Sequence, residues 1–140
     1  MAYWLMKSEP GSWSWQDQQK AGAKGTSWDG VRNHQAKANL MKMKKSDRAF
    51  FYHSGDEKSV VGVVEIVGEH RPDPSDKTGK FVVVDVKTLS PIPNPVSLKM
   101  CKREKSLAKM VLLNNSRLSV QPVTDAEWTI VCRLGGHKPG

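Results

Sequence analysis

The segment Arg48–Glu69 reads RAFFYHSGDEKSVVGVVEIVGE and decides the class of fold. Its two apolar parts, Arg48–Ser54 and Val60–Glu69, are rich in β-branched and aromatic residues, which favour strands. Gly55–Lys58 lies between them as a short turn sequence, so we expect an antiparallel hairpin. Phe81–Leu89 is likewise rich in β-branched and aromatic residues, and it follows a loop rich in Pro, Asp, Ser and Gly. The segment and its continuation therefore predict a three-stranded antiparallel meander.

Shorter elements surround the meander. Tyr3–Lys7 predicts a buried strand that ends at a turn containing Pro10, and Leu118–Val123 predicts a last strand. The prolines 91, 93 and 95 are expected to exclude regular sheet, and 24–30 is expected to be a polar loop. Helices are expected over Trp13–Lys20 with Ser12 as N-cap, over Val31–Met43, in one or two short pieces within Val96–Met110, and from the capping box Thr124–Glu127 to Gly135.

The order of these elements narrows the architecture. Strands and helices do not alternate as βαβ units, which disfavours a doubly wound parallel sheet. The pattern predicts an α+β fold, a small mixed β-barrel of about six strands surrounded by short helices. A length of 140 residues suits one domain, residues 1–140, with no repeat or linker.

The charge balance favours an anionic partner. The chain has 22 Lys and Arg against 14 Asp and Glu, a formal charge of +8 that is concentrated in its two ends. Basic residues together with five tryptophans suit nucleic acid, because cations meet phosphates and aromatic faces stack on bases. The alternative is that the charge serves solubility alone.

Several function classes are disfavoured. Apolar runs are too short for a membrane span, the N-terminus shows no secretion signal, and two cysteines indicate a reducing compartment. The histidines lack metal-ligand spacing, and phosphate-cradle and nucleophile-elbow motifs are absent. We expect no metal, no cofactor, no catalytic residue and no membrane partner, and we expect a monomer.

Three segments combine aromatic and polar side chains near strand ends, as a pocket for one flat base requires. They are Lys7–Pro10, Trp28–Gln35 and Phe51–Ser54, and a fourth is Ser116–Val120. Each candidate has a plain structural alternative. Trp28 would be a core plug, Asn33 a helix cap, Arg32 an ion-pair partner, and Tyr52 and His53 ordinary strand residues. Trp4, Trp13, Trp15 and Trp128 are expected to pack in the interior.

Four motifs in order carry a resemblance that covers nearly the whole chain: YWLMKSEP at 3–10, WDGVRNHQA at 28–36, FFYHS at 50–54 and SRLSVQPV at 116–123. They closely resemble the EVE domain family. The resemblance implies a PUA-like barrel related to YTH domains, and recognition of modified nucleobases, with modified cytosine in DNA as the leading ligand. Eukaryotic members carry a basic N-terminal extension that this sequence lacks. It therefore looks like a bacterial, cytoplasmic member, and a eukaryotic one would be nuclear.

The resemblance also assigns residues. A flipped base would lie against Trp28, and Glu9 would accept from a cytosine N4 amino group; an internal Lys7–Glu9 ion pair is the alternative. Apart from the resemblance, the hypothesis of a non-enzymatic reader predicts that basic residues of two clusters hold the flanking phosphates. The expected base pocket is Lys7, Ser8, Glu9, Trp28, Arg32, Asn33, Tyr52, His53, Ser54, Arg117 and Ser119, and the expected phosphate contacts are Lys42, Lys44, Lys45, Arg48, Lys102 and Arg103.

Two further hypotheses stay open. The first is an enzyme that acts on a modified base or RNA, with His53 as general acid or base and a serine or Glu9 as its partner. The second is a scaffold whose basic faces bind a protein. Product formation on modified oligonucleotides distinguishes an enzyme from a non-enzymatic reader.

Overall fold

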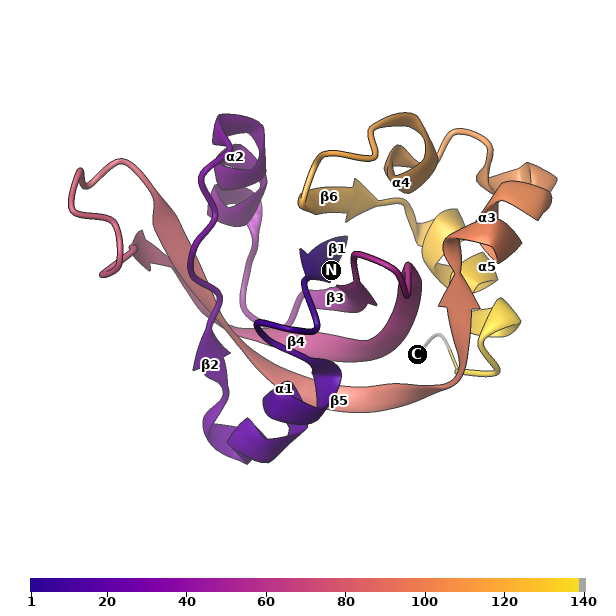
Figure 1. Cartoon of the computed structure of the whole chain (residues 1–140), viewed down its shortest axis with the longest axis horizontal. Helices are drawn as coiled ribbons and strands as arrows, with labels where there is room; N and C mark the ends of the chain where they lie inside the picture. Colours follow the sequence, from indigo (N-terminus) through magenta and orange to yellow (C-terminus); the bar gives the residue numbers. More distant parts are fainter. Residues whose placement is uncertain (139–140) are drawn as a thin grey trace.

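The computed structural model describes residues 1–138 and contains one six-stranded mixed sheet with short helices on both of its faces (Figure 1). The strand order is β2-β5-β4-β3-β1-β6. The strands are β1 (Tyr3–Ser8), β2 (Thr26–Ser27), β3 (Arg48–His53), β4 (Ser59–Pro72), β5 (Val82–Ser97) and β6 (Val120–Val123). The helices are α1 (Trp15–Ala21), α2 (His34–Lys42), α3 (Leu98–Arg103), α4 (Val111–Asn114) and α5 (Asp125–Leu134), with 3-10 turns η1 (Gly22–Lys24) and η2 (Lys105–Leu107).

The meander β3-β4-β5 is antiparallel, as the sequence predicts. β4 and β5 are long, at 14 and 16 residues, and their pairing shifts register at four places. Such bulges bend and twist a strand, and both strands curve strongly in Figure 1. β1 then adds to β3 in parallel, and β6 adds to β1 in antiparallel orientation.

The sheet separates two hydrophobic cores. Side chains alternate between the faces of a strand, so Phe50 and Tyr52 of β3 enter one core, while Ala49 and Phe51 enter the other. The Phe51 side holds α1 and α2. The Phe50 side holds α3, α4 and α5, where Trp128 stacks on Phe50 with ring centroids 3.8 Å apart. α5 begins at the predicted capping box, with Thr124 as its N-cap.

The structure corrects the strand predictions at two places. β5 continues through Pro91, Pro93 and Pro95 as far as Ser97. β2 pairs only with Asp85 and Val86, so beyond these residues the outer edge of β5 has no strand partner within residues 1–138. The prolines, which lack a backbone N–H, therefore interrupt no ladder on that edge. β2 itself lies inside the segment expected to be a loop.

The helix boundaries also differ from the predictions. α1 begins at Trp15 because Ser14, rather than Ser12, forms a reciprocal capping box with Asp17. α2 begins only at His34 and ends at Lys42. α4 follows the predicted helical segment and was not expected.

Gly62 of β4 lets α1 approach the sheet. A Cβ atom at this position would lie 2.3 Å from Cη2 of Trp15. Trp15 is 6% exposed and also meets Phe51 edge to face, with ring centroids 5.4 Å apart. Because position 62 has no side chain, Trp15 and with it α1 can pack closely on the sheet.

We predict that Gly62→Ala lowers the free energy of unfolding by about 1–3 kcal/mol, because the added methyl group overlaps a ring that is itself enclosed. Urea denaturation measures this change. Gly11→Ala is the matched control, since nothing lies within 4 Å of its added Cβ. Equal stability of the two variants would show that Trp15 is not held against the sheet.

Candidate functional site

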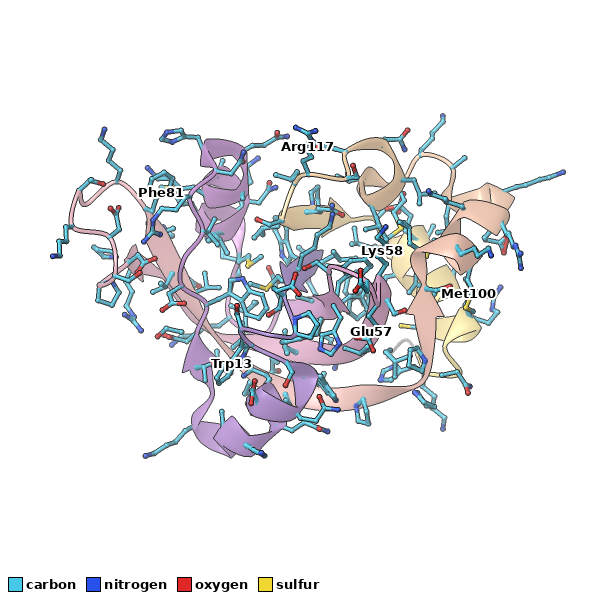
Figure 2. The ribbon with its side chains drawn as sticks, viewed as in Figure 1. Trp13, Glu57, Lys58, Phe81, Met100 and Arg117 are labelled. Atoms are coloured by element: carbon cyan, nitrogen blue, oxygen red, sulfur yellow. The ribbon has the colours of Figure 1, made fainter. Side chains whose placement is uncertain are left out.

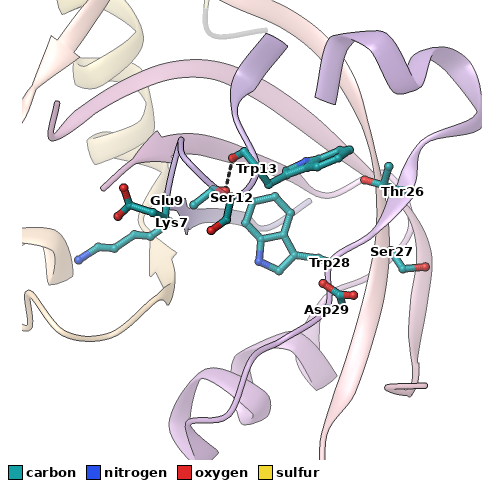
Figure 3. Close-up of a pocket in the computed structure, with 9 residues that line it drawn as sticks. Lys7, Glu9, Ser12, Trp13, Thr26, Ser27, Trp28 and Asp29 are labelled. Carbon is teal, nitrogen blue, oxygen red and sulfur yellow. Dashed lines mark hydrogen bonds between the residues drawn. The ribbon is translucent and has the colours of Figure 1, made fainter. Parts of the chain in front are cut away.

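A hollow of about 470 Å³ opens where β1 ends (Figure 3). Strand β1, the turn before α1 and the segment around β2 form its walls, so three stretches that are distant in sequence meet there. We call it the first hollow. It is lined by Lys7, Ser8, Glu9, Ser12, Trp13, Thr26, Ser27, Trp28 and Asp29.

Two tryptophans supply the aromatic surface of the first hollow (Figure 3). Trp28 is 8% exposed and packs edge to face on Phe51, so it is at once a core residue and a wall. Trp13 is only partly buried, and its Nε1 donates to Oε1 of Gln18 over 2.8 Å. The same oxygen accepts from Thr26 Oγ1 over 3.1 Å. Gln18 is fully buried and therefore fixes Trp13 and Thr26 from behind the hollow.

The polar lining combines one ammonium with two carboxylates. Lys7 Nζ donates to the carbonyl of Ser116 over 2.5 Å, and no ion pair joins it to Glu9 among residues 1–138. Burial lowers the pKa of Lys7. Glu9 accepts a long hydrogen bond of 3.4 Å from Ser54, and Asp29 is exposed. Carboxylate oxygens therefore remain available to accept from a ligand.

Lys7 also borders a second hollow of about 270 Å³, so the predicted pocket residues are divided between two sites. In the parallel register Lys7 lies beside Tyr52 and Ser8 beside His53. Neighbouring residues of a strand point to opposite faces, so Tyr52 and His53 cannot line one pocket. The second hollow is lined by Lys7, Tyr52, Ser54, Gly55, Lys58, Leu98, Leu112 and Ser116.

His53 is not part of the lining of the first hollow. It is 5% exposed, and its Nε2 accepts from the backbone N–H of Trp15 over 2.9 Å. Its Nδ1 therefore carries the proton and donates to the carboxylate of Glu57. The hydroxyl of Ser8 donates to the carbonyl of Trp13 instead of to His53. Both ring nitrogens are engaged, and His53 positions the start of α1.

Arg32 and Asn33 have the structural roles that the sequence analysis offered as alternatives. Asn33 caps α2 by accepting from Ala36 N over 2.9 Å. Arg32 pairs with Asp73 over 2.9 Å, and Asp73 also accepts from the backbone N–H of Gly30 over 3.0 Å. This buried carboxylate ties the segment after Trp28 to the connection between β4 and β5. Neither Arg32 nor Asn33 lines the first hollow.

The remaining predicted residues lie around the two hollows or away from them. The carbonyl of Ser119 accepts from Lys7 N over 2.9 Å, and Arg117 is exposed between α4 and β6 (Figure 2). Lys102 and Arg103 are exposed at the end of α3. The basic residues near the end of α2 and the start of β3 lie at the N-terminal end of β1. They are Lys42, Lys44, Lys45 and Arg48. Ser8 is at the other end of β1, roughly 17 Å from Tyr3 at about 3.3 Å per residue.

Five lining residues were not among the expected pocket residues: Ser12, Trp13, Thr26, Ser27 and Asp29. Of these, Asp29 lies within the segment Trp28–Gln35 that was expected near the pocket. For Trp13 a signal was present, because the capping box of Ser14 and Asp17 places it before the helix and not on its packed face. Thr26 and Ser27 are placed at the hollow by their pairing with β5, and no local sequence pattern predicts this pairing.

The fold and the aromatic hollow define an α+β domain with a YTH-like fold. The solved YTH domain of Zygosaccharomyces rouxii MRB1 matches 96% of this chain and 86% of that chain with a TM-score of 0.58 and 16% identity, which shows the shared fold. The chain belongs to the EVE domain family, whose model matches residues 2–134. The resemblance seen in the four motifs is thus confirmed.

Relatives match the chain over nearly its whole length. Thymocyte nuclear protein 1 of Rattus norvegicus is 36% identical over 98% of this chain and 75% of its own length. A protein of Rhodopseudomonas palustris solved by NMR is 54% identical, with a TM-score of 0.92 over 97% of this chain and 94% of that one. Human THYN1 protein, solved in complex with 5-methylcytosine containing DNA, is 33% identical, with a TM-score of 0.90 over 99% and 100% of the two chains.

Residues 1–138 contain neither a membrane-spanning helix nor a cluster of metal ligands. No helix there is long and apolar enough to cross a membrane. No group of three or more His, Cys, Asp or Glu side chains in that range is arranged to hold a metal ion.

We predict that Asp73→Asn lowers the free energy of unfolding by about 1–3 kcal/mol at neutral pH, because buried donors lose a charged acceptor. Burial alone would raise the pKa of Asp73, but hydrogen bonds from Ser75, Arg32 and Gly30 outweigh it and hold the pKa well below 3.8. A depressed pKa contributes stability above the unfolded value, and this contribution is lost as pH falls through the folded value.

The difference between wild type and Asp73→Asn should therefore be constant down to about pH 4 and shrink below it. Urea denaturation at neutral pH measures the full difference, and urea denaturation near pH 3 measures the difference after part of the carboxylate's contribution has been lost. Asp56→Asn, in an exposed turn, is the control. A difference that does not change on acidification would contradict the assigned role of the carboxylate.

Proposed function

We propose that this chain is a non-enzymatic reader that binds a modified base of nucleic acid in the first hollow, with 5-methylcytosine in DNA as the leading ligand. One observation carries the proposal. The hollow places two tryptophans beside free hydrogen-bond acceptors, in a chain that shares its whole fold with a relative solved on 5-methylcytosine containing DNA.

The size and the aromatic surface suit one flat base. A volume of about 470 Å³ lies within the roughly 300–1,000 Å³ of small-ligand sites. Trp13 is held in place through Gln18, and Trp28 is held by Phe51, so both rings are ordered before a ligand arrives. Ordered walls lower the entropic cost of binding. A base must leave the stack to enter, which favours single-stranded or weakly paired sites.

The polar lining favours a base with an exocyclic amino group. Glu9 and Asp29 present carboxylate oxygens, and carboxylates accept from the N4 amino group of cytosine. Thymine carries the same 5-methyl group but has an acceptor, O4, where cytosine has the amino donor. Thymine is therefore the informative competitor, because it tests the amino group with the methyl group held constant.

Binding without covalent chemistry agrees with the geometry around His53, the histidine that the sequence analysis offered as a general acid or base. His53 is buried, and both of its nitrogens have partners inside the protein. A general base needs access to the proton that it removes. The net charge of +8 and the bacterial relatives support action on nucleic acid in a bacterial cytoplasm.

The deciding experiment compares three single-stranded oligonucleotides that differ only in one central base: 5-methylcytosine, cytosine or thymine. Calorimetry should show the tightest binding for 5-methylcytosine. Mass spectrometry after long incubation should show unchanged oligonucleotides. Equal affinity for all three would refute the reader, and an altered product would replace it with the enzyme.

We predict that Trp13→Ala weakens binding of the 5-methylcytosine oligonucleotide by about 1–3 kcal/mol, the contribution of one stacking face. Its stability should fall only slightly, because Trp13 is partly exposed. Trp28→Ala is the comparison, and it should lose about 3–5 kcal/mol of stability because the ring is enclosed in the core. Unchanged affinity of a folded Trp13→Ala protein would remove Trp13 from the site.

We further predict that Glu9→Gln reduces the preference for 5-methylcytosine over thymine by roughly tenfold, because a neutral amide accepts more weakly and offers thymine O4 a donor. Calorimetry with the two oligonucleotides measures the ratio. Glu104→Gln, at the C-cap of α3 and outside the lining of the first hollow, is the control for the loss of one negative charge. An unchanged ratio would assign discrimination to Asp29 instead.

A further inference from the structure

We propose that the second hollow binds the phosphate and sugar of the nucleotide next to the base held in the first hollow. The inference rests on the proposed function and adds a subsite to it. It gives the bound strand a direction across the protein, from the first hollow past Lys7 toward α3.

The charges that line the second hollow are all positive. Lys7 and Lys58 are its charged lining residues, and no carboxylate belongs to the lining. The first hollow, by contrast, contains Glu9 and Asp29. A phosphodiester is attracted by ammonium groups and repelled by carboxylates. The two adjacent hollows therefore suit different parts of one nucleotide chain, the base in one and the backbone in the other.

The two hollows are joined at one residue. Lys7 lines both of them, and its Nζ lies 5.6 Å from the centroid of the Tyr52 ring, on the side of the second hollow. The contact of 3.4 Å between Ser54 Oγ and Glu9 Oε2 also crosses this boundary. A ligand that fills the first hollow thus has its continuation next to Lys7 without crossing another element.

The neutral lining suits a sugar and a phosphate better than a second base. Ser54, Ser116 and Tyr52 carry hydroxyl groups, and burial raises the pKa of Tyr52 to about 12, so its phenol stays protonated. Leu98 and Leu112 form an apolar patch for the C–H face of a sugar. A tryptophan wall is absent from this lining, and about 270 Å³ is smaller than the first hollow.

Lys58 has a backbone conformation that fold stability alone does not favour. Its φ is +46°, and Lys58 and Ser46 are the two non-glycine residues with positive φ within residues 1–138. Glycine or asparagine occupies this region at lower cost. Lys58 is exposed at the mouth of the hollow, and its carbonyl accepts from Leu98 N over 2.8 Å. A strained residue that presents a charge into a hollow is typical of a binding site.

The experiment uses Lys58→Gly, which removes the ammonium and places the residue type that φ +46° favours. Lys77→Gly is the matched control, because it removes the same charge from the exposed connection between β4 and β5. The probes are 5-methyl-2′-deoxycytidine and two short single-stranded oligonucleotides, one with 5-methylcytosine at the 5′ end and the other at the 3′ end. Calorimetry over a range of salt concentrations gives the affinities.

We expect Lys58→Gly to weaken one of the two oligonucleotides by about tenfold and to leave the nucleoside unchanged. The slope of log affinity against log salt should fall by about 0.7, the value for one phosphate contact on a single strand. Lys77→Gly should change neither quantity. A melting temperature equal to or above that of wild type would confirm that the variant is folded.

Two results overturn the subsite. Equal weakening of both oligonucleotides would show a general charge effect, and unchanged affinity for both would show that the strand does not enter the second hollow. In either case the loss of binding in Trp13→Ala would leave the proposed function standing. If neither Trp13→Ala nor Lys58→Gly affected any probe, Trp13 would be removed from the site together with the subsite, and the comparison of 5-methylcytosine, cytosine and thymine would decide whether the reader stands.

Discussion

The parallel pairing of β1 with β3 is the constraint on which both hollows depend. It inserts the N-terminal strand between β3 and β6 and sets Lys7 beside Tyr52 and Ser8 beside His53. Because side chains alternate between the faces of a strand, Lys7 and Tyr52 lie on the Phe50 side of the sheet, and Ser8 and His53 lie on the Phe51 side. The two hollows are consequences of a single register, and a slip by one residue would exchange their linings.

Buried carboxylates fix the segments that the sheet does not hold. Asp47 is 4% exposed and accepts from Ala2 N, Trp4 Nε1 and Lys44 N, which joins the start of β1 to the turn after α2. Asp73 does the same for the segment between Trp28 and α2. At both carboxylates, several hydrogen bonds to one charged acceptor take the place of the backbone hydrogen bonds of a sheet. Hydrogen bonds to a charged acceptor are stronger than those between neutral groups.

The sequence predicts those features that depend on local chemistry. The meander follows from the composition around Arg48–Glu69, and the start of α5 follows from the capping box at Thr124. The cap at Asn33 and the ion pair of Arg32 were foreseen as alternatives. Features that depend on pairing over long distances were not foreseen. Because β2 is short, part of β5 is an edge strand and can contain prolines. The length of β1 separates Lys44 from the first hollow.

The unequal environments of the five tryptophans have an optical consequence. Trp4, Trp15 and Trp128 are between 1% and 6% exposed and belong to the two cores, whereas Trp13 is partly open to the first hollow. Indole emission shifts and is quenched when its surroundings change, and a stacked base is an efficient quencher. Trp13 therefore gives this protein an intrinsic fluorescent reporter at the mouth of its own hollow. Occupancy can be followed without a label: Trp28, the other wall of the hollow, adds to the signal, and Trp4, Trp15 and Trp128 form a background outside the lining.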